Sequence, residues 1–286
     1  MQSRAHPCRF YPAWSSQGAA VLLLLGLVAS PQLRAESELE LEQELSRQAS
    51  PLSGAATLSY FRNSYDASAY AAYQAVTVDG SLRYRQDWGQ LRLTFGGEQE
   101  LLHGEQSSWF DPLLEYRTPT WALSDSLSWQ GGVGVYLPAS RTSRKDRLEY
   151  APQARAYLFW RPEGDWQFYL SPRYRYNQYR YQTAGEQVLT EHQASVAVDA
   201  LWHFRPDWYL DVNGSLGWAR NFYGRSLDTR FTASEELGWE VTPHWSLALG
   251  HSNAGRFYDP EYGPGQGFEL YDRRSSTFYL ATTFSF

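Results

Sequence analysis

Alternation of apolar and polar residues with a period of two constrains this chain most strongly. Residues 166–183 show it best, because the even positions from Trp166 to Tyr176 are apolar or aromatic and most odd positions, such as Gln167, Ser171 and Arg173, are polar. The same alternation recurs in residues 147–161 and 191–205. Side chains point to opposite faces along a β-strand, so each segment has one apolar face and one polar face. A helical period fits none of these segments.

Five tryptophan residues recur at intervals of about forty residues from Trp88 onward. Each interval holds two long alternating segments, whereas a propeller blade would place four short strands in that length. The pattern predicts twelve strands, at residues 55–65, 75–86, 91–101, 112–123, 127–139, 147–161, 166–183, 189–205, 208–223, 229–241, 245–258 and 269–286. The recurring residues are Trp88, Trp129, Trp166, Trp208 and Trp245.

The connections between these strands alternate between very short turns and longer polar loops. Arg205-Pro-Asp207 and Thr242-Pro-His244 are typical short turns, and each is followed directly by a tryptophan. Outer-membrane barrels have short periplasmic turns, longer outer loops and aromatic girdles at both interfaces. We therefore predict an all-β fold, a twelve-stranded antiparallel up-and-down barrel that crosses a membrane.

Three features favour a membrane barrel over a soluble one. The strands reach the 9–11 residues or so that a tilted transmembrane strand needs. Their polar face carries many charged groups of both signs, too many to bury in a dry core. The segment Thr277–Phe286 resembles the C-terminal signature by which Gram-negative outer-membrane barrels are recognised for assembly, which implies an interaction of Phe286 with the assembly machinery.

The N-terminal part of the chain is predicted to be an export signal. Arg4 and Arg9 precede the apolar segment Ala19–Ala29, which is too short to span a bilayer comfortably. We assign residues 1–35 to the signal, 36–52 to an acidic periplasmic lead and 53–286 to the barrel. The segment ESELELEQELS (residues 36–46) is either a solvated tail or a plug or partner-binding helix.

The predicted polar face assigns charged residues of both signs to the lumen. They either fill a narrow barrel with ion pairs or line separate walls of an open pore and select solutes. The overall charge of −6 argues against nucleic acid as a partner. The candidate lumen or selectivity residues are Arg83, Arg85, Arg155, Arg173, Arg175, Arg230, Glu236 and Glu240.

One segment resembles a known family of porins. Residues 150–181 contain Pro-x-Ala-Arg-Ala-Tyr followed by Arg-Tyr-Arg-Tyr, similar to the oligogalacturonate- and sialic-acid-specific porins. The resemblance implies a twelve-stranded monomeric barrel that admits acidic oligosaccharides past lumenal arginines. It would assign that role to Arg155, Arg173 and Arg175, while the acids Glu236 and Glu240 depart from an arginine-dominated path.

A second segment resembles outer-membrane lipid hydrolases. Gly250–Gly255 is similar to the His-x-Ser-Asn segment of outer-membrane phospholipase A and the lipid A deacylases. In that family one residue separates the histidine from the serine, which need a common face. Here His251 and Ser252 are adjacent, so a regular strand places them on opposite faces unless a bulge intervenes.

The favoured function from sequence is passive passage of a small hydrophilic solute through an outer-membrane channel. A lipid hydrolase that uses His251 and Ser252, or a closed scaffold barrel that docks partners, remain the alternatives. No metal, zinc, phosphate-loop or dinucleotide motif is present, so we expect no cofactor. The expected partners are outer-membrane lipid, lipopolysaccharide and the solute.

Overall fold

The computed structural model describes residues 50–102, 106–259, 263–264, 268, 270–273 and 276–286. The predicted export signal and residues 36–49 of the acidic lead lie outside the described residues. Among the described residues, no helix is long and apolar enough to cross a membrane.

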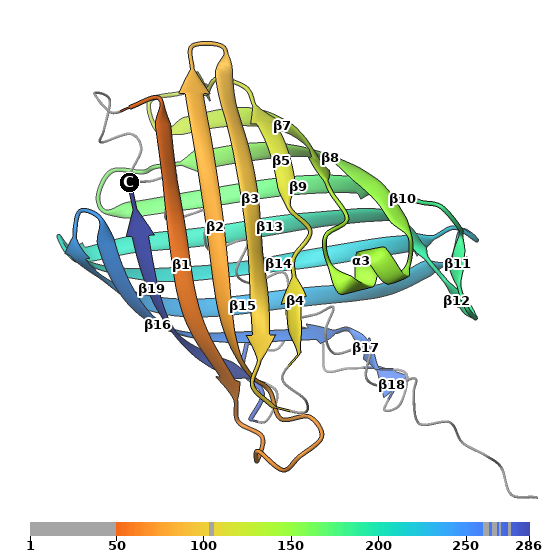
Figure 1. Ribbon diagram of the computed structural model, residues 1–286. Coiled ribbons are helices and arrows are strands. Elements are labelled where there is room, and N and C mark those ends of the chain that lie inside the picture. The colour runs from red at the N-terminus through yellow and green to blue at the C-terminus, as the bar shows by residue number, and fades with distance from the viewer. Residues whose placement is uncertain (1–49, 103–105, 260–262, 265–267, 269, 274–275) are drawn as a thin grey trace, which may run out of the picture.

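The described residues form a closed antiparallel barrel of twelve strands (Figure 1), which confirms the predicted fold class. Eleven of the twelve positions in the ring are each occupied by one strand. The fourth position, as far as the structure describes it, consists of three short strands. The single strands are β1 (Leu52–Asn63), β2 (Gln74–Gln86), β3 (Gly89–Glu100), β7 (Leu127–Tyr136), β8 (Leu148–Trp160), β9 (Trp166–Tyr176), β13 (Thr190–Arg205), β14 (Trp208–Asn221), β15 (Ser226–Thr242), β16 (Trp245–Arg256) and β19 (Thr277–Ser285). The pieces are β4 (Ser107–Trp109), β5 (Leu113–Arg117) and β6 (Trp121–Ala122).

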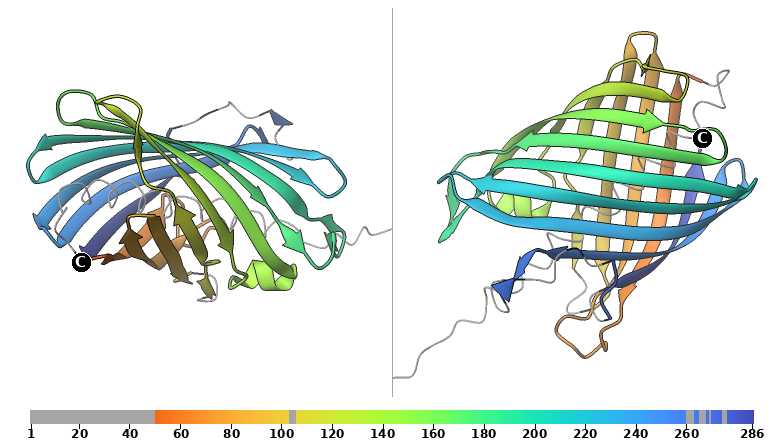
Figure 2. Two further views of the ribbon diagram at one scale, coloured as in Figure 1. Left: turned by 90° about the horizontal axis from the view of Figure 1, so that it is seen from above. Right: turned by 180° about the vertical axis from the view of Figure 1, so that it is seen from behind.

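The first and last strands close the ring. β1 pairs with β19 from Ala55 opposite Ser285 to Asn63 opposite Thr277, and each other strand pairs with its neighbours in sequence. Figure 2 shows the resulting wall from above and from behind. Closure gives the first and last strands backbone partners on both sides, which a sheet in hydrocarbon requires.

Three predicted strands are shorter or more irregular than the alternation suggested. The fourth is interrupted between β5 and β6 around Pro119, which has no backbone N–H for the ladder. The seventh ends at Tyr176 instead of residue 183, because Asn177 leaves the strand and its side chain donates to the Thr190 carbonyl. The last begins at Thr277 instead of residue 269, after a turn in which the Asp272 amide donates to Ser276 Oγ.

The two faces of the wall have the predicted chemistry. On β13, Val198 and Trp202 point outward with 49% and 36% of their surfaces exposed, whereas Asp199 between them is buried. Leu170 on β9 is likewise exposed, and its neighbour Ser171 is fully buried. Apolar side chains therefore cover the outside of the barrel and polar side chains line the inside.

Aromatic side chains form a belt around the outside at the short-turn end. Trp166 on β9 stacks on Trp202 of β13 with ring centroids 5.2 Å apart, and Trp208 stacks on Trp239 at 5.8 Å. The belt continues across the closing strands, where Trp245 contacts Phe284 at 5.1 Å. Such belts mark the level of the lipid headgroups.

The two ends of the barrel differ. The end with the short turns also holds both ends of the described barrel, where the Gly54 amide donates to the Phe286 carbonyl. The opposite end carries the small elements visible at the right of Figure 1. These are α3 (Arg141–Lys145), β10 (Gln178–Tyr179), the hairpin of β11 (Thr183–Ala184) and β12 (Gln187–Val188), and the hairpin of β17 (Tyr258–Asp259) and β18 (Gly263–Pro264).

Two glycines give tyrosine rings room to lie flat against the inner wall. Gly238 on β15 is opposite Tyr209, and Gly250 on β16 is opposite Tyr279. A Cβ atom would lie 1.9 Å from the Tyr209 ring at Gly238 and 2.1 Å from the Tyr279 ring at Gly250. Only glycine accommodates rings this close, so these positions fix the direction of both tyrosines.

Replacing either glycine with alanine should destabilise the barrel. Gly238→Ala and Gly250→Ala force the facing ring out of place, at a cost of about 1–3 kcal/mol in the free energy of unfolding. Urea unfolding in lipid vesicles, followed by tryptophan fluorescence, measures this change. Gly217→Ala is the control, because the atoms nearest to its added Cβ lie 3.9 Å away. Equal stability of all three variants would contradict the packing described.

Candidate functional site

The inner wall brings arginines directly opposite one another. Arg83 on β2 faces Arg92 on β3, and Arg155 on β8 faces Arg173 on β9. Like charges at opposite positions of neighbouring strands repel. The side of the barrel from β2 to β9 carries more basic than acidic inward-facing groups among the described residues, although Asp79, Glu98, Glu100 and Glu115 lie on the same face. In the described residues its inward-facing basic groups, called here the arginine wall, are Arg83, Arg85, Arg92, Arg117, Arg155, Arg173 and Arg175.

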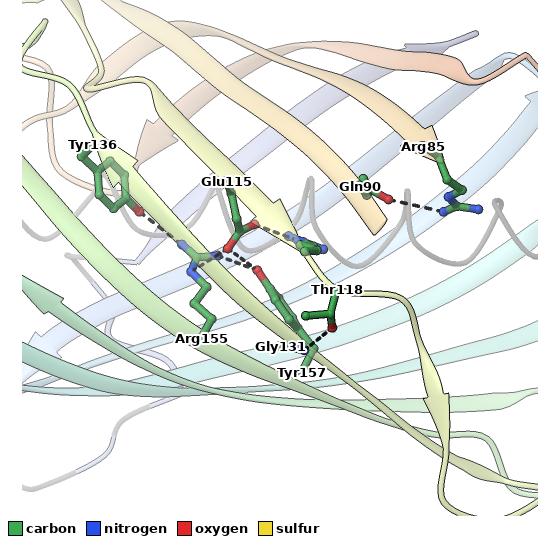
Figure 3. Close-up of polar contacts among 9 residues, drawn as sticks. Arg85, Gln90, Glu115, Thr118, Gly131, Tyr136, Arg155 and Tyr157 are labelled. Carbon is green, nitrogen blue, oxygen red and sulfur yellow. Dashed lines mark hydrogen bonds and ion pairs between the residues drawn. The ribbon is translucent and has the colours of Figure 1, made fainter. Parts of the chain in front are cut away.

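Glu115 on β5 organises the central part of this wall (Figure 3). Its carboxylate accepts from Arg117 Nε at 2.7 Å and from the Tyr157 hydroxyl at 2.7 Å, and it lies 3.7 Å from Arg155 Nε. The Glu115, Arg117 and Arg155 side chains are each about 1% exposed. Buried charges are tolerated when they are paired and hydrogen-bonded in this way.

Tyrosine rings hold the arginine planes in place. The Arg117 guanidinium lies over the Tyr157 ring at 4.1 Å, and that of Arg175 lies over the Tyr136 ring at 4.9 Å. Arg155 Nη2 donates to the Tyr136 hydroxyl at 3.2 Å. Cation–π contacts and hydrogen bonds together orient these cations along the wall.

The opposite side of the barrel carries acids. Asp211 on β14 faces Glu236 on β15, and Asp199 on β13 lies nearby on the same inner face. The Glu236 carboxylate accepts hydrogen bonds from the Tyr209 hydroxyl at 3.0 Å and the Tyr279 hydroxyl at 2.9 Å. The two glycine-supported tyrosines thus converge on one lumenal acid.

Strand order places Arg92 and Asp211 on facing walls. β3 and β14 are half a circuit apart in the ring, and Figure 1 shows β2 and β3 in front of β14 and β15. Arg92 and Asp211 are each the fourth residue of a strand that starts at the short-turn end. At this level near the short-turn end, a basic and an acidic group therefore lie on opposite sides of the lumen.

The residues predicted from sequence are spread along the lumen and do not converge on one compact site. Arg83, Arg155, Arg173, Arg175 and Glu236 lie on the walls just described. Arg85 also belongs to the arginine wall but is solvent-exposed at the short-turn end, where its Nη2 lies 3.5 Å from Gln90 Oε1. The other two candidates are nearer the ends of the barrel: Glu240 lies 3.7 Å from His203 Nε2, and Arg230 is opposite Arg256.

Two central residues were missed from sequence. Glu115 and Arg117 lie on the irregular fourth strand, whose short alternating segment Leu113–Arg117 was the available signal. Tyr157, Tyr209 and Tyr279 were also not selected, because their importance depends on which residue faces them across the strands.

The structure separates the two candidate hydrolase residues. Ser252 is buried on the inner face opposite Thr277, whereas His251 lies on the outer face between the rings of Tyr271 and Phe278. The pairing of β15 with β16 is regular through both positions, so no bulge brings them together. His251 Nδ1 instead pairs with Glu235 Oε2 at 2.7 Å.

At the end with the longer loops, Tyr73 donates its hydroxyl hydrogen to Glu98 at 2.6 Å. Burial raises the pKa of Tyr73, and the negative charge of Glu98 raises it further. Tyr73 therefore remains a hydrogen-bond donor under all physiological conditions. Among the described residues, no group of three or more His, Cys, Asp or Glu side chains is arranged to hold a metal ion.

Comparison with known proteins identifies the fold. No family model matches the chain, and no curated protein matches its sequence. The NanC porin structure superposes with a TM-score of 0.53 and 13% identity, over 81% of this chain and 98% of that one. An outer membrane channel from Pseudomonas putida F1 gives 0.55 and 14%, over 82% and 95%. The chain therefore has the twelve-stranded barrel fold found in these outer-membrane porins and channels.

Removing the charge of Glu115 should weaken the barrel markedly. Glu115→Gln leaves the Arg117 and Arg155 guanidinium groups without this carboxylate, at an expected cost of about 3–5 kcal/mol in the free energy of unfolding. Tyr157→Phe removes one neutral hydrogen-bond donor and should cost about 1 kcal/mol. Urea unfolding in vesicles compares the two. Glu115→Gln with no larger effect than Tyr157→Phe would show that Glu115 does not organise the wall.

Proposed function

We propose that the protein is an outer-membrane channel through which small hydrophilic solutes pass down their concentration gradients. The observation that carries the proposal is a closed barrel with an apolar exterior and an inner face lined with charged and tyrosine side chains. Twelve strands enclose more space than the eight-stranded barrels whose interior side chains fill them. The walls supply guanidinium, carboxylate and tyrosine hydroxyl groups at which a solute can exchange water for protein hydrogen bonds.

The proposed solutes carry anionic groups and many hydroxyls, as acidic oligosaccharides do. Arginine planes bind carboxylates through two parallel hydrogen bonds, and tyrosine rings offer flat surfaces to sugar rings. The facing acids Asp211 and Glu236 repel fully anionic solutes from one wall and so hold them against the arginines. Passage stays passive, because each contact is weak enough to be exchanged for the next.

The proposal includes the cellular setting. Residues 1–35 direct export, the outward apolar face contacts outer-membrane lipid and lipopolysaccharide, and Phe286 is read by the assembly machinery. The structure supports an accessible signature, since Phe278, Leu280, Phe284 and Phe286 are exposed on the outer face. Deleting Phe286 tests this part: assembled barrel in outer-membrane fractions should fall while export to the periplasm is unchanged.

Planar-bilayer recording tests the channel proposal. The purified protein should conduct, and Arg155→Ala combined with Arg173→Ala should shift ion preference from anions toward cations. Glu236→Gln should shift it the other way, since it removes a negative charge from the facing wall. Arg62→Ala is the control for charge removal, because Arg62 lies on the outer face of β1 and is exposed.

Two results would contradict this function. Absence of conductance in correctly folded protein favours the closed scaffold. Lipid hydrolysis that is abolished by Ser252→Ala favours the enzyme, although the opposite faces of His251 and Ser252 provide no hydrogen bond between base and nucleophile.

A further inference from the structure

The connection between β14 and β15 is a tight, ordered turn at the end of the barrel with the longer loops. Residues 222–225 join the end of β14 at Asn221 to the start of β15. The Asn221 side chain accepts hydrogen bonds from the Tyr223 amide at 3.1 Å and from the Arg225 amide at 2.9 Å. Gly224 has a φ of 77°, in the left-handed region that glycine adopts readily. The turn is therefore held in one shape by its own hydrogen bonds.

Two exposed arginines flank this turn. Arg220 precedes it on β14, opposite His192 of β13, and Arg225 is its last residue. Arg220 Nε donates to the Gly224 carbonyl at 2.8 Å, which fixes the side chain beside the turn. Within the part of the chain that the structure describes, neither arginine forms an ion pair. The positive charge of both groups is therefore available to a partner from outside the chain.

The turn lies just beyond a second level of aromatic side chains on the outer face. Trp218, two residues before Arg220, is 45% exposed, and Tyr174 of β9 lies in the same row of the sheet, because both are paired with Ala194. Trp218 follows Trp208 of the short-turn belt by ten residues of β14. A rise of about 3.3 Å per residue and a tilt of about 40° separate the two tryptophans by about 25 Å along the barrel axis, the height of the apolar band in outer-membrane barrels. The two arginines are therefore at the level of lipid headgroups.

The acid on the neighbouring strand is associated with a histidine. His192 Nδ1 forms a hydrogen bond with the Tyr174 hydroxyl at 2.7 Å, and its Nε2 lies 3.5 Å from Glu191 Oε2. Glu191 and His192 thus offset one another when the imidazole is protonated. Arg220 and Arg225 give this part of the outer surface its positive charge.

We propose that Arg220 and Arg225 bind phosphate groups of lipopolysaccharide in the outer leaflet of the membrane. Guanidinium planes bind phosphate through two parallel hydrogen bonds. The loops of outer-membrane barrels face the cell exterior, where lipopolysaccharide presents its phosphates at the headgroup level. The exposed ring of Trp218 lies below the site, so acyl chains of the same molecule can pack against the apolar outer face. This inference rests on the outer-membrane setting of the proposed function and not on conduction.

Binding of purified lipopolysaccharide to the folded full chain in detergent tests the site. Arg220→Ala combined with Arg225→Ala should lower the affinity by about tenfold at low salt. The matched control is Arg161→Ala combined with Arg205→Ala, which removes the same charge at the short-turn end and should leave the affinity unchanged. Enzymatically dephosphorylated lipopolysaccharide should bind the unaltered protein about tenfold more weakly than the intact lipid, a comparison that needs no variant to fold.

The possible results separate the site from the channel. Equal binding of intact and dephosphorylated lipopolysaccharide, or an equal loss in both double variants, would overturn the site. Tighter binding of phosphatidylglycerol than of lipopolysaccharide would overturn the assigned partner. Binding that depends on both arginines in a barrel that does not conduct would support the site and overturn the channel. Conduction by a protein whose lipopolysaccharide binding ignores the two arginines would overturn the site while the channel stands.

Discussion

Satisfaction of backbone hydrogen bonds is the constraint on which the rest of the structure depends. Hydrocarbon offers no water to an unpaired strand edge, so a sheet crosses a membrane only when its first and last strands pair. The pairing of β1 with β19 meets this requirement and also brings both ends of the barrel to one side. Closure then divides every strand into a lipid face and a lumen face, and the sequence must alternate accordingly.

The lumen face shows how charge is accommodated in such a barrel. Arginines predominate on the side from β2 to β9, but acids lie among them, and one ion pair joins Glu115 and Arg117 on a single strand. Glu115 offsets part of the charge of Arg117 and Arg155, and tyrosine hydroxyls support Glu236 on the facing side. These charged and tyrosine side chains form hydrogen-bonded groups on the lumen face, which closure of the barrel does not itself require.

Period-two alternation was sufficient to predict the fold class, the twelve strands and the inward direction of Arg83, Arg155, Arg173 and Glu236. Each of these can be predicted without knowing which strands are neighbours, because the alternation along one strand already decides which side chains share a face. The interruptions of the strands near Pro119 and Asn177 were not predicted, because they depend on local hydrogen bonding that overrides the alternating pattern. The Glu115 network and the tyrosine rings over Gly238 and Gly250 depend on register between strands, which one sequence does not specify.

The most direct test of the account compares two neighbouring positions on β13. A fluorophore is attached to Val198→Cys or Asp199→Cys in vesicles, and its quenching by brominated lipid chains and by a soluble anion is measured. A membrane barrel with a polar lumen predicts strong lipid quenching at position 198 and quenching by the soluble anion at position 199. Lipid quenching at position 199 with none at 198 would mean that charged side chains face the bilayer, and would contradict both the membrane barrel and the channel.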